Sequence, residues 1–288
     1  MALVPGARLT VVSFPEEPGE PPFFEAIGAL AERSGAAFRE ARQVGGATCA
    51  DLWEQPLDLL FAVSWRYMVP PAVYRRPARG AYVFHDSLLP AYRGFAPTVW
   101  AIVNGERETG ATLFEMTETV DSGAIVGQRR VPIAADDTIA EVLEKVTEAY
   151  LDLLSAYIGP LLDGTAPRRE QDGGQATYTC RRLAADGRID WSAPTTAIYN
   201  LIRGHGRPYW GAFTTVDGRT LRVWKARLPD SVLSYVGRVP GRVVEVQRGR
   251  GTTVLTGDGA ILLVEVEVDG QPAPAPDILR SLGQTLGR

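Results

Sequence analysis

A histidine and an aspartate follow two different apolar segments of this chain. His85 comes directly after the apolar run 81–84, and Asp121 lies shortly beyond a second run at 110–116. An imidazole and a carboxylate that meet can exchange protons with a substrate, which is the minimum equipment for general acid–base catalysis. Each residue also has a simpler interpretation. A histidine at a strand end is more often a hydrogen-bonded packing residue, and Asp121-Ser122-Gly123 is typical of a turn.

The segments around these two residues predict an α/β domain. Short apolar runs of the kind that a parallel sheet buries on both faces predict strands at 9–14, 57–63, 81–84 and 110–116. Open α/β sheets place ligands at the carboxyl ends of their strands. We therefore expect the three segments that follow the runs to meet at one rim, namely 65–71, 85–94 and 118–123.

The pattern changes in the second half of the chain. Thr138 and Glu141 form a capping box that predicts the start of a long helix, and Gly159-Pro160 predicts its end. Residues 163–187 are polar and rich in glycine, which predicts a linker or a functional loop. A helix near 195–203 and several short β-rich runs follow. Their Gly turns predict a small barrel or sandwich after the α/β domain.

Composition and charge exclude several classes of protein. The chain has 288 residues, 45% hydrophobic and 22% charged, which is typical of folded globular domains. No apolar run reaches the length of a membrane span, and the amino terminus lacks a signal-peptide layout, so we expect a cytoplasmic protein without a membrane partner. A net charge of −4 argues against a nucleic-acid partner. Two cysteines without a CxxC and two histidines predict no metal site, although carboxylates alone could hold an ion.

Three common phosphate-binding or nucleophile motifs are absent from the sequence. No GxGxxG follows the first predicted strand, so a dinucleotide site is not supported. The chain also lacks the GxxxxGK[ST] loop that holds nucleoside triphosphates. No GxSxG is present, so the sequence does not predict a nucleophilic serine of the hydrolase type.

A long ordered pattern resembles the 10-formyltetrahydrofolate-dependent formyltransferases. It consists of residues 85–94 (HDSLLPAYRG), 104–106 (NGE) and 121–126 (DSGAIV). Residues 187–191 (GRIDW) and 208–213 (PYWGAF) resemble the linker and the opening of the second domain in methionyl-tRNA and amino-sugar formyltransferases. Residues 175–182 and 284–287 are similar to the formyltransferase domain of the lipid A aminoarabinose pathway. The resemblance covers the chain from about residue 57 to the end.

The resemblance implies a fold and a reaction. The fold is a Rossmann-like, mostly parallel α/β domain over residues 1–187, followed by an OB-like barrel over residues 188–288. The reaction moves a formyl group from the folate N10 to a primary amine through a tetrahedral oxyanion. By resemblance, His85 stabilises the developing negative charge, and Asp121 sets the protonation of the histidine and relays protons.

The resemblance also implies which residues bind the folate and the acceptor. The loop that holds the pterin ring aligns with Tyr67, Met68, Val69 and Pro70. The stretch that closes the other side of the ring consists of Glu118, Thr119 and Val120. The residues expected to contact the acceptor are Ser87, Leu88, Arg93, Arg181 and Arg182. His205, flanked by two glycines, is expected to be a turn residue.

The sequence departs from the family pattern at one position. The family motif reads Asn-x-His, but Val83 stands two residues before His85. Valine has no hydrogen-bond donor, and the loss of one oxyanion donor typically costs about 2.7–4 kcal/mol, or ~10²–10³ in rate. Another group supplies the donor, or the enzyme is slow, or the chain performs a different one-carbon reaction, or it is an inactive folate-binding homologue. The sequence leaves these alternatives open.

The acceptor is expected to be a small amine. In tRNA-modifying relatives a basic insertion follows the first strand, but here residues 15–22 are acidic and would repel phosphates. An amino-sugar nucleotide or an amino-acid-derived metabolite is therefore favoured over initiator tRNA, which stays as a weaker alternative. A homo-oligomer remains open.

Overall fold

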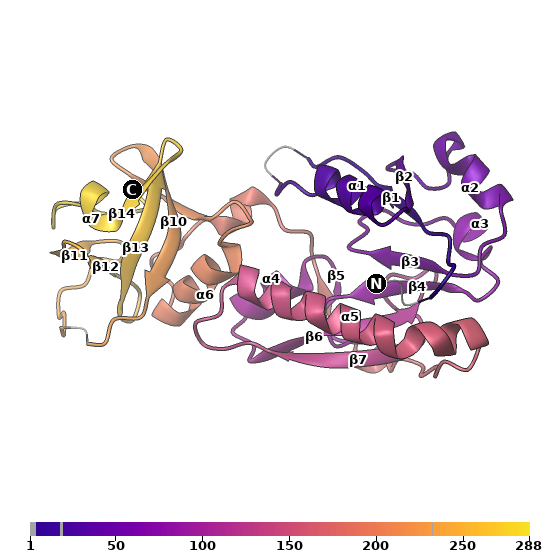
Figure 1. The fold of residues 1–288 in the computed structure, drawn as a ribbon. Helices are drawn as coiled ribbons and strands as arrows, with labels where there is room; N and C mark the ends of the chain where they lie inside the picture. Colours follow the sequence, from indigo (N-terminus) through magenta and orange to yellow (C-terminus); the bar gives the residue numbers. More distant parts are fainter. Residues whose placement is uncertain (1–3, 18–19, 232) are drawn as a thin grey trace. The chain divides into compact units, whose positions relative to one another are not determined.

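A computed structural model of the chain describes residues 4–17, 20–231 and 233–288 (Figure 1). Contacts between Cα atoms divide the chain into two compact units. The first unit comprises Met1–Pro97, Thr109–Pro132 and Glu144–Cys180, and the second comprises Thr98–Glu108, Ile133–Leu143 and Arg181–Arg288. The second unit thus includes two segments from the part of the chain that precedes residue 188.

The first unit contains three parallel strand pairs. These pairs are β1 (Thr10–Ser13) with β2 (Ala37–Glu40), β3 (Leu60–Val63) with β4 (Ala81–His85), and β5 (Arg93–Gly94) with β8 (Tyr178–Thr179). The predicted Rossmann-like domain with a mainly parallel sheet is confirmed, and the apolar run 81–84 forms β4 as expected. The predicted strand at 9–14 forms as β1, but its partner β2 was not predicted, because its four residues include Arg39 and Glu40.

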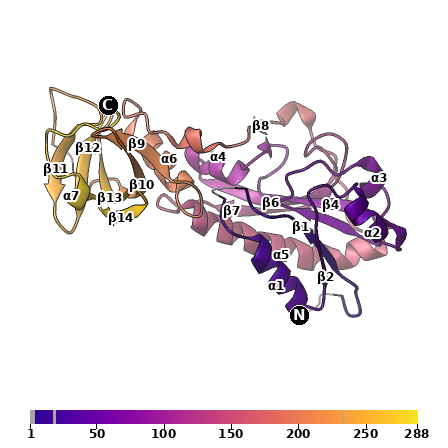
Figure 2. The same ribbon diagram turned by 90° about the horizontal axis from the view of Figure 1, so that it is seen from above.

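The predicted strand at 110–116 forms as β6 (Glu108–Glu115), which runs antiparallel to β4. Next to β6 lies β7 (Ile125–Pro132), giving a sheet with the order β3-β4-β6-β7 (Figure 1), of which β4, β6 and β7 are also labelled in Figure 2. The strand β7 was not predicted. It begins with buried Ile125, Val126 and Gly127 and continues into the exposed Arg129-Arg130 pair, so it shows no regular alternation. This antiparallel side therefore carries the turn with Asp121, which joins β6 to β7.

The helices α1 (Phe24–Arg33), α2 (Ala50–Glu54), α3 (Pro71–Tyr74) and α5 (Ile139–Asp163) complete the segments between these strands. The predicted capping box is confirmed, since the Thr138 backbone N–H donates to Glu141 Oε2 at 2.7 Å. The predicted end at Gly159-Pro160 is wrong, because α5 continues to Asp163 with Pro160 inside it. Proline loses one helical hydrogen bond. Leu161, which is 1% exposed, packs the last turn into the interior in spite of that loss.

The second unit holds a single antiparallel sheet. Its strands are β9 (Ala212–Val216), β10 (Arg219–Arg227), β11 (Val243–Gln247), β12 (Gly251–Leu255), β13 (Ala260–Val268) and β14 (Gln271–Pro274). Their order is β11-β12-β13-β10-β9, with β14 also paired to β13. The short β-rich runs expected after residue 203 form strands.

The predicted OB-like barrel is wrong. Among the described residues the edge strands β9 and β11 do not pair with each other, so the sheet stays open. Helices cover the sheet where a barrel would fold back on itself: α6 (Thr195–His205) packs on β9, β10 and β13, and α7 (Ala275–Ile278) packs on β12, β13 and β14. The remaining helix, α4, spans Pro97–Val103.

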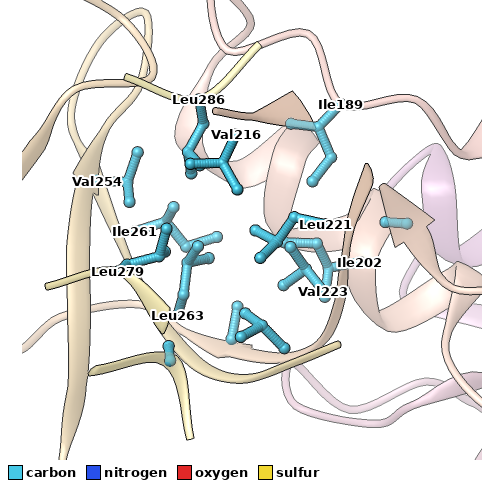
Figure 3. Close-up of a cluster of buried hydrophobic side chains, with 14 of the residues drawn as sticks. Ile189, Ile202, Val216, Leu221, Val223, Val254, Ile261, Leu263, Leu279 and Leu286 are labelled. Atoms are coloured by element: carbon cyan, nitrogen blue, oxygen red, sulfur yellow. The ribbon is translucent and has the colours of Figure 1, made fainter. Parts of the chain in front are cut away.

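The core of the second unit lies between these helices and the sheet (Figure 3). Leu221 and Val223 of β10 and Ile261 and Leu263 of β13 are fully buried there, together with Ile202 of α6. Burying a side chain of this size stabilises a fold by about 1.5–3 kcal/mol.

Two properties concern the described part of the chain as a whole. None of its helices has the length and hydropathy that crossing a bilayer requires. Nor does it contain a cluster of three or more His, Cys, Asp or Glu side chains arranged to hold a metal ion.

Candidate active site

His85 stands at the carboxyl end of β4 and is 7% exposed. Its Nε2 lies 2.8 Å from the carbonyl oxygen of Tyr92. A carbonyl oxygen only accepts hydrogen bonds, so the geometry assigns the proton to Nε2. In the neutral imidazole, Nδ1 then carries the lone pair. The ring also lies edge-on to Phe114, with centroids 6.5 Å apart, which fixes its plane.

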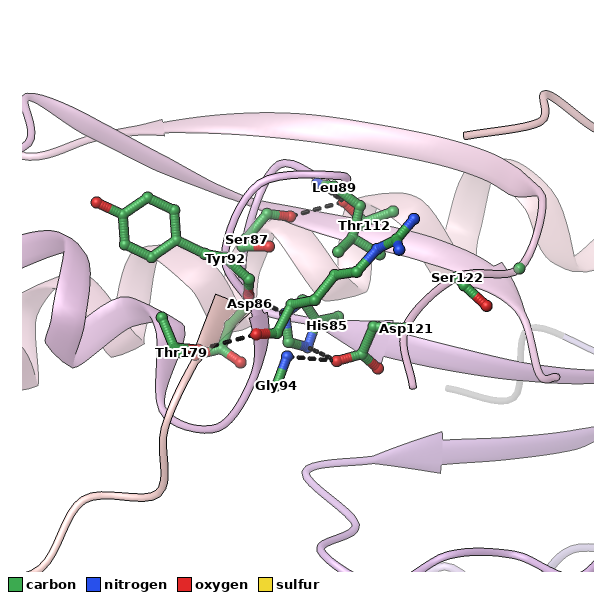
Figure 4. A network of polar contacts seen from close by, with 12 residues as sticks. His85, Asp86, Ser87, Leu89, Tyr92, Gly94, Thr112, Asp121, Ser122 and Thr179 are labelled. Atoms are coloured by element: carbon green, nitrogen blue, oxygen red, sulfur yellow. Dashed lines mark hydrogen bonds and ion pairs between the residues drawn. The ribbon is translucent and has the colours of Figure 1, made fainter. Parts of the chain in front are cut away.

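Asp121 lies beside the other nitrogen of this ring (Figure 4). Its Oδ2 is 3.7 Å from His85 Nδ1 and accepts a hydrogen bond of 2.7 Å from the Gly94 backbone N–H. A separation of 3.7 Å is too long for a hydrogen bond but short for a charge interaction. The Asp121 carboxylate therefore faces Nδ1 of His85 without a direct hydrogen bond to it. The two residues singled out by the sequence are brought together as expected.

A tight turn presents Asp121. The residue has φ +49°, a left-handed conformation that aspartate tolerates better than most side chains. Thr117 Oγ1 and Ser122 Oγ each lie 3.0 Å from the Thr119 carbonyl oxygen and donate to it. Gly123 follows, and a Cβ at that position would lie 1.9 Å from the Glu115 carbonyl oxygen. Only glycine lets the turn approach β6 this closely.

A segment far along the chain completes the site, and we call residues 169–179 the strap. Arg169 exchanges two backbone hydrogen bonds with Ile125, of 2.8 and 2.9 Å. Further on, β8 pairs with β5, and Thr177 Oγ1 accepts from the Tyr92 backbone N–H at 2.8 Å. This stretch lies within residues 163–187, for which the sequence predicts a linker or functional loop. Its polar, Gly-rich residues carry no periodicity that could have predicted the pairing.

The loops expected to hold a pterin ring both lie in the first unit. The Tyr67 ring packs on Phe14 at 5.1 Å, and Val69 is half-buried. Met68 is 64% exposed, and the exposed Pro70 lies against Gly45, where an added Cβ would be 2.8 Å from it.

The second predicted stretch is tied to this loop region by an ion pair. Glu118 Oε1 lies 2.8 Å from Arg75 Nη2, just after α3. Thr119 contributes its carbonyl to the turn, and Val120 is 44% exposed. Exposed apolar side chains therefore stand on two linked loops, at Met68 and at Val120.

Three residues expected to contact the acceptor have partners inside the first unit. Ser87 is buried, and its Oγ donates to the Ala91 carbonyl at 2.7 Å. Leu88 is half-buried against Gly110. Arg93 is 5% exposed, and its Nη2 donates to Gln171 Oε1 at 2.7 Å. These contacts shape the loop after His85, and a direct role with an acceptor stays a prediction.

Arg181 and Arg182 belong to the second unit. Arg181 is exposed. Arg182 is buried, with its guanidinium 4.5 Å from the centroid of the Trp100 ring and in hydrogen-bond contact with the His205 imidazole. A guanidinium packed in this way supports the interior of its unit. The predicted contact of this arginine pair with an acceptor stays a prediction.

The expectation that His205 is a turn residue is wrong. It is the last residue of α6 and only 1% exposed. Burial, and after it the nearby positive charge of Arg182, lower the pKa of His205 to about 4. The flanking glycines suggested a turn, but α6 includes Gly204, whose missing side chain leaves room for Ile102 and Val103.

Val83 occupies the position of the family asparagine. It is half-buried on β4, pairs in register with Phe114, and packs against Leu89, Phe114 and Ile125. Because side chains alternate along a strand, Val83 and His85 point to the same face. The position next to the catalytic candidate is therefore apolar and offers no donor.

Two models of known protein families match this chain. A family model described as formyl transferase matches residues 20–158, and a model described as formyl transferase, C-terminal domain, matches residues 183–283. The chain belongs to the formyl transferase family. The paired His85 and Asp121 both lie within the first match.

Solved structures share the fold. The formyl transferase is similar to HypX from Aquifex aeolicus in complex with tetrahydrofolic acid, with 19% identity, a TM-score of 0.68, and coverage of 96% of this chain and 47% of that chain. It thus spans about half the length of that chain. It is also similar to an N-formyltransferase from Helicobacter canadensis in complex with folinic acid and dTDP-3-aminofucose. There the identity is 17%, the TM-score 0.62, and the coverage 82% and 81%.

A third similar structure is the methionyl-tRNA formyltransferase from Clostridium thermocellum. The identity is 18%, the TM-score 0.56, and the coverage 77% of this chain and 94% of that chain. At these identities the likeness shows a common fold. The three neighbours act in different contexts, so the fold does not decide the acceptor.

The close approach at Gly123 makes the turn sensitive to one methyl group. We expect Gly123→Ala to lower the free energy of unfolding by roughly 1–3 kcal/mol, because the added Cβ would overlap the Glu115 carbonyl. Urea unfolding measures the change. Gly173→Ala is the matched control in the strap, since nothing lies within 4 Å of a Cβ there. Equal stability of the two variants would contradict the packing described.

His205 should make stability depend on pH. Its pKa in the folded chain is about 4, below the ordinary 6.5, so the unfolded chain binds a proton in this window that the folded chain does not. The contribution of His205 to the free energy of unfolding is fully present above the ordinary pKa of histidine and is lost as the pH falls toward 4. Between about pH 7.5 and about pH 5 we expect a loss of roughly 2 kcal/mol from this group.

Urea unfolding at the two pH values measures this loss. In His205→Gln the difference in unfolding free energy between the two pH values should shrink by that amount, whatever the stability of the variant itself. An unchanged difference would show that His205 already titrates normally in the folded protein.

Proposed function

We propose that this formyl transferase moves a formyl group from 10-formyltetrahydrofolate to a primary amine of a small metabolite. The observation that carries the proposal is the pairing of His85 and Asp121 at 3.7 Å. Backbone groups of one loop hold both side chains, through the Tyr92 carbonyl and the Gly94 N–H. The structures of HypX with tetrahydrofolic acid and of an N-formyltransferase with folinic acid and an amino-sugar nucleotide support the donor and the acceptor class.

The residues present fit a folate donor. Met68 and Val120 expose apolar side chains on two loops that the Arg75–Glu118 ion pair connects. Exposed apolar side chains of this kind suit the faces of a flat ring system. When bound, 10-formyltetrahydrofolate supplies an activated formyl carbon. Tyr67 and Val69 would support the loop from behind, and Glu118 and Thr119 would hold the second loop.

The chemistry falls to His85 and Asp121. An acceptor amine arrives as an ammonium ion and must lose a proton before its nitrogen can attack. Since the Tyr92 carbonyl holds the Nε2 proton, Nδ1 is the nitrogen that can accept one. Asp121 Oδ2 then stabilises the imidazolium by charge. The protonated Nδ1 can donate to an oxygen that becomes negative, which links proton removal to charge stabilisation.

Val83 favours a second candidate function, an inactive or slow folate-binding homologue. The apolar cluster of Val83 with Leu89, Phe114 and Ile125 places no donor beside His85 on this face of β4. Charge stabilisation then rests on His85 or on a backbone amide. A rate reduced by about 10²–10³ would follow if neither compensates for the missing donor.

A small acceptor fits the charges better than tRNA does. Residues 15–22 are acidic in sequence, and Glu20 among them pairs with Arg66 at 2.6 Å. On the sheet of the second unit, Arg207 pairs with Glu265 at 3.0 Å and Arg222 with Glu267 at 3.3 Å. Arginines that face carboxylates attract phosphates weakly. These pairs support the proposal of a small amine.

An amine panel tests the proposed function. We expect the purified chain with 10-formyltetrahydrofolate to release tetrahydrofolate in the presence of at least one small primary amine, amino-sugar nucleotides included. In His85→Gln and Asp121→Asn the rate should fall by about 10²–10⁴, because proton transfer and charge stabilisation are lost. The reaction without amine is the control.

Two outcomes would overturn parts of the proposal. Folate binding without release for any amine would favour the inactive homologue. If the chain formylates charged initiator tRNA and accepts no small amine, the proposed class of acceptor is wrong, although the proposed reaction, formyl transfer, is correct.

Val83→Asn tests whether the missing donor limits the rate. We expect this variant to turn over faster than the wild type, by up to about 10²–10³, because the amide supplies a donor on the same face as His85. Val83→Ala is the matched control, since it removes the packing contact without adding a donor. If the asparagine variant is no faster than the alanine variant, another group already serves the oxyanion.

A further inference from the structure

One side chain of the strap connects the two segments that hold His85. Gln171 Nε2 donates to the carbonyl oxygens of Asp121 and Gly123, at 2.9 and 2.8 Å. Its Oε1 accepts from Arg93, at 2.7 Å from Nη2 and 3.2 Å from Nε. A single amide thus spans from the Asp121 turn to the loop that carries Tyr92 and Gly94.

The orientation of this amide is unambiguous. Carbonyl oxygens only accept and a guanidinium only donates, so the Gln171 nitrogen must face Asp121 and Gly123 while its oxygen faces Arg93. The amide therefore makes four hydrogen bonds, which is close to the full capacity of a glutamine side chain. No other residue type of this length offers two donors on one side and a neutral acceptor on the other.

The connection matters because Asp121 has no rigid element of its own. It lies in a turn with φ +49°, a conformation that persists only where the surroundings enforce it. Its carboxylate must reach Gly94 at 2.7 Å while staying 3.7 Å from His85. His85 is the last residue of β4 and Gly94 lies in β5, so both partners are distant from the turn along the chain. Gln171 supplies a direct link between the backbone of the turn and the loop that carries Gly94.

We propose that Gln171 is a positioning residue for formyl transfer, whose amide sets the placement of the Asp121 carboxylate against the His85 imidazole. This inference rests on the proposed function for its effect on rate, but its geometric part stands independently. Gln171 acts through Asp121 and touches neither reactant. Loss of the amide lets the turn relax, and a misplacement of about 1 Å can cost about 10² in rate.

The test compares three variants of the full chain. Gln171→Ala removes the amide, and Gln171→Glu keeps the length and the contact with Arg93 but cannot donate to the two carbonyls. Gln175→Ala is the matched control, because Gln175 lies on the same strap and donates to Asp172 at 2.9 Å. Thermal unfolding confirms that each variant is folded.

Two readouts are needed. The first is steady-state kinetics with the amine accepted in the panel: kcat should fall about 10–100-fold in both Gln171 variants, with KM for the formyl donor changed less than about twofold. The second is the pair of imidazole ring signals in two-bond ¹H–¹⁵N spectra, which the two histidines of the chain supply. His85→Gln assigns them.

The His85 signals should move in the Gln171 variants in the same direction as in Asp121→Asn, while the His205 signals stay in place. Gln175→Ala should leave both histidines and the kinetics unchanged. Wild-type kcat and unmoved His85 signals in Gln171→Glu would overturn the inference while leaving formyl transfer intact. If no amine is formylated, the proposed function fails, and the imidazole signals alone still decide whether Gln171 positions Asp121.

Discussion

The site depends on how one carboxylate is shared between a backbone amide and an imidazole. Asp121 Oδ2 accepts from Gly94 N–H at 2.7 Å and lies 3.7 Å from His85 Nδ1. The hydrogen bond from the Gly94 backbone N–H is the shorter of the two contacts, so it determines the position of the carboxylate. The imidazole interacts with the carboxylate by charge. Everything nearby maintains this arrangement. The Tyr92 carbonyl fixes the ring tautomer, Gly123 permits the turn, and the strap holds the loop that carries Gly94.

Part of this site follows from the sequence, because the apolar runs before His85 and Asp121 form the neighbouring strands β4 and β6. The expected shared rim of carboxyl ends is wrong for this pair, since β4 and β6 run antiparallel and their carboxyl ends lie at opposite edges. The turn between β6 and β7 brings Asp121 to His85 instead. The resemblance to formyltransferases then singled out the pair, and the family match confirms the family, while the roles of the two residues stay a prediction. The sequence also correctly predicts features that local patterns specify, such as the capping box at Thr138.

The missed features depend on contacts between distant residues. The barrel expected for the second domain requires closure between strands, but α6 and α7 bury the face of β13 instead. Neither helix packing nor its effect on closure can be read from strand periodicity. Pro160 breaks a helix by local rules, and the burial of Leu161 overrides them. Gln171 gave no signal at all, because a polar residue in a polar stretch is marked only by the partners that the fold brings to it.

The strap also bears on where this catalytic domain ends. The amino-terminal family match stops at residue 158, before Arg169, Gln171 and β8. Tyr178 meets Arg93 across 85 positions of the chain, and joining such distant residues carries a large entropic cost until the rest of the first unit is in place. The loop bearing Gly94 would then be shaped late, after the sheet has formed. The stretch that shapes the loop bearing Gly94 thus falls between the two family matches, which end at residue 158 and resume at residue 183.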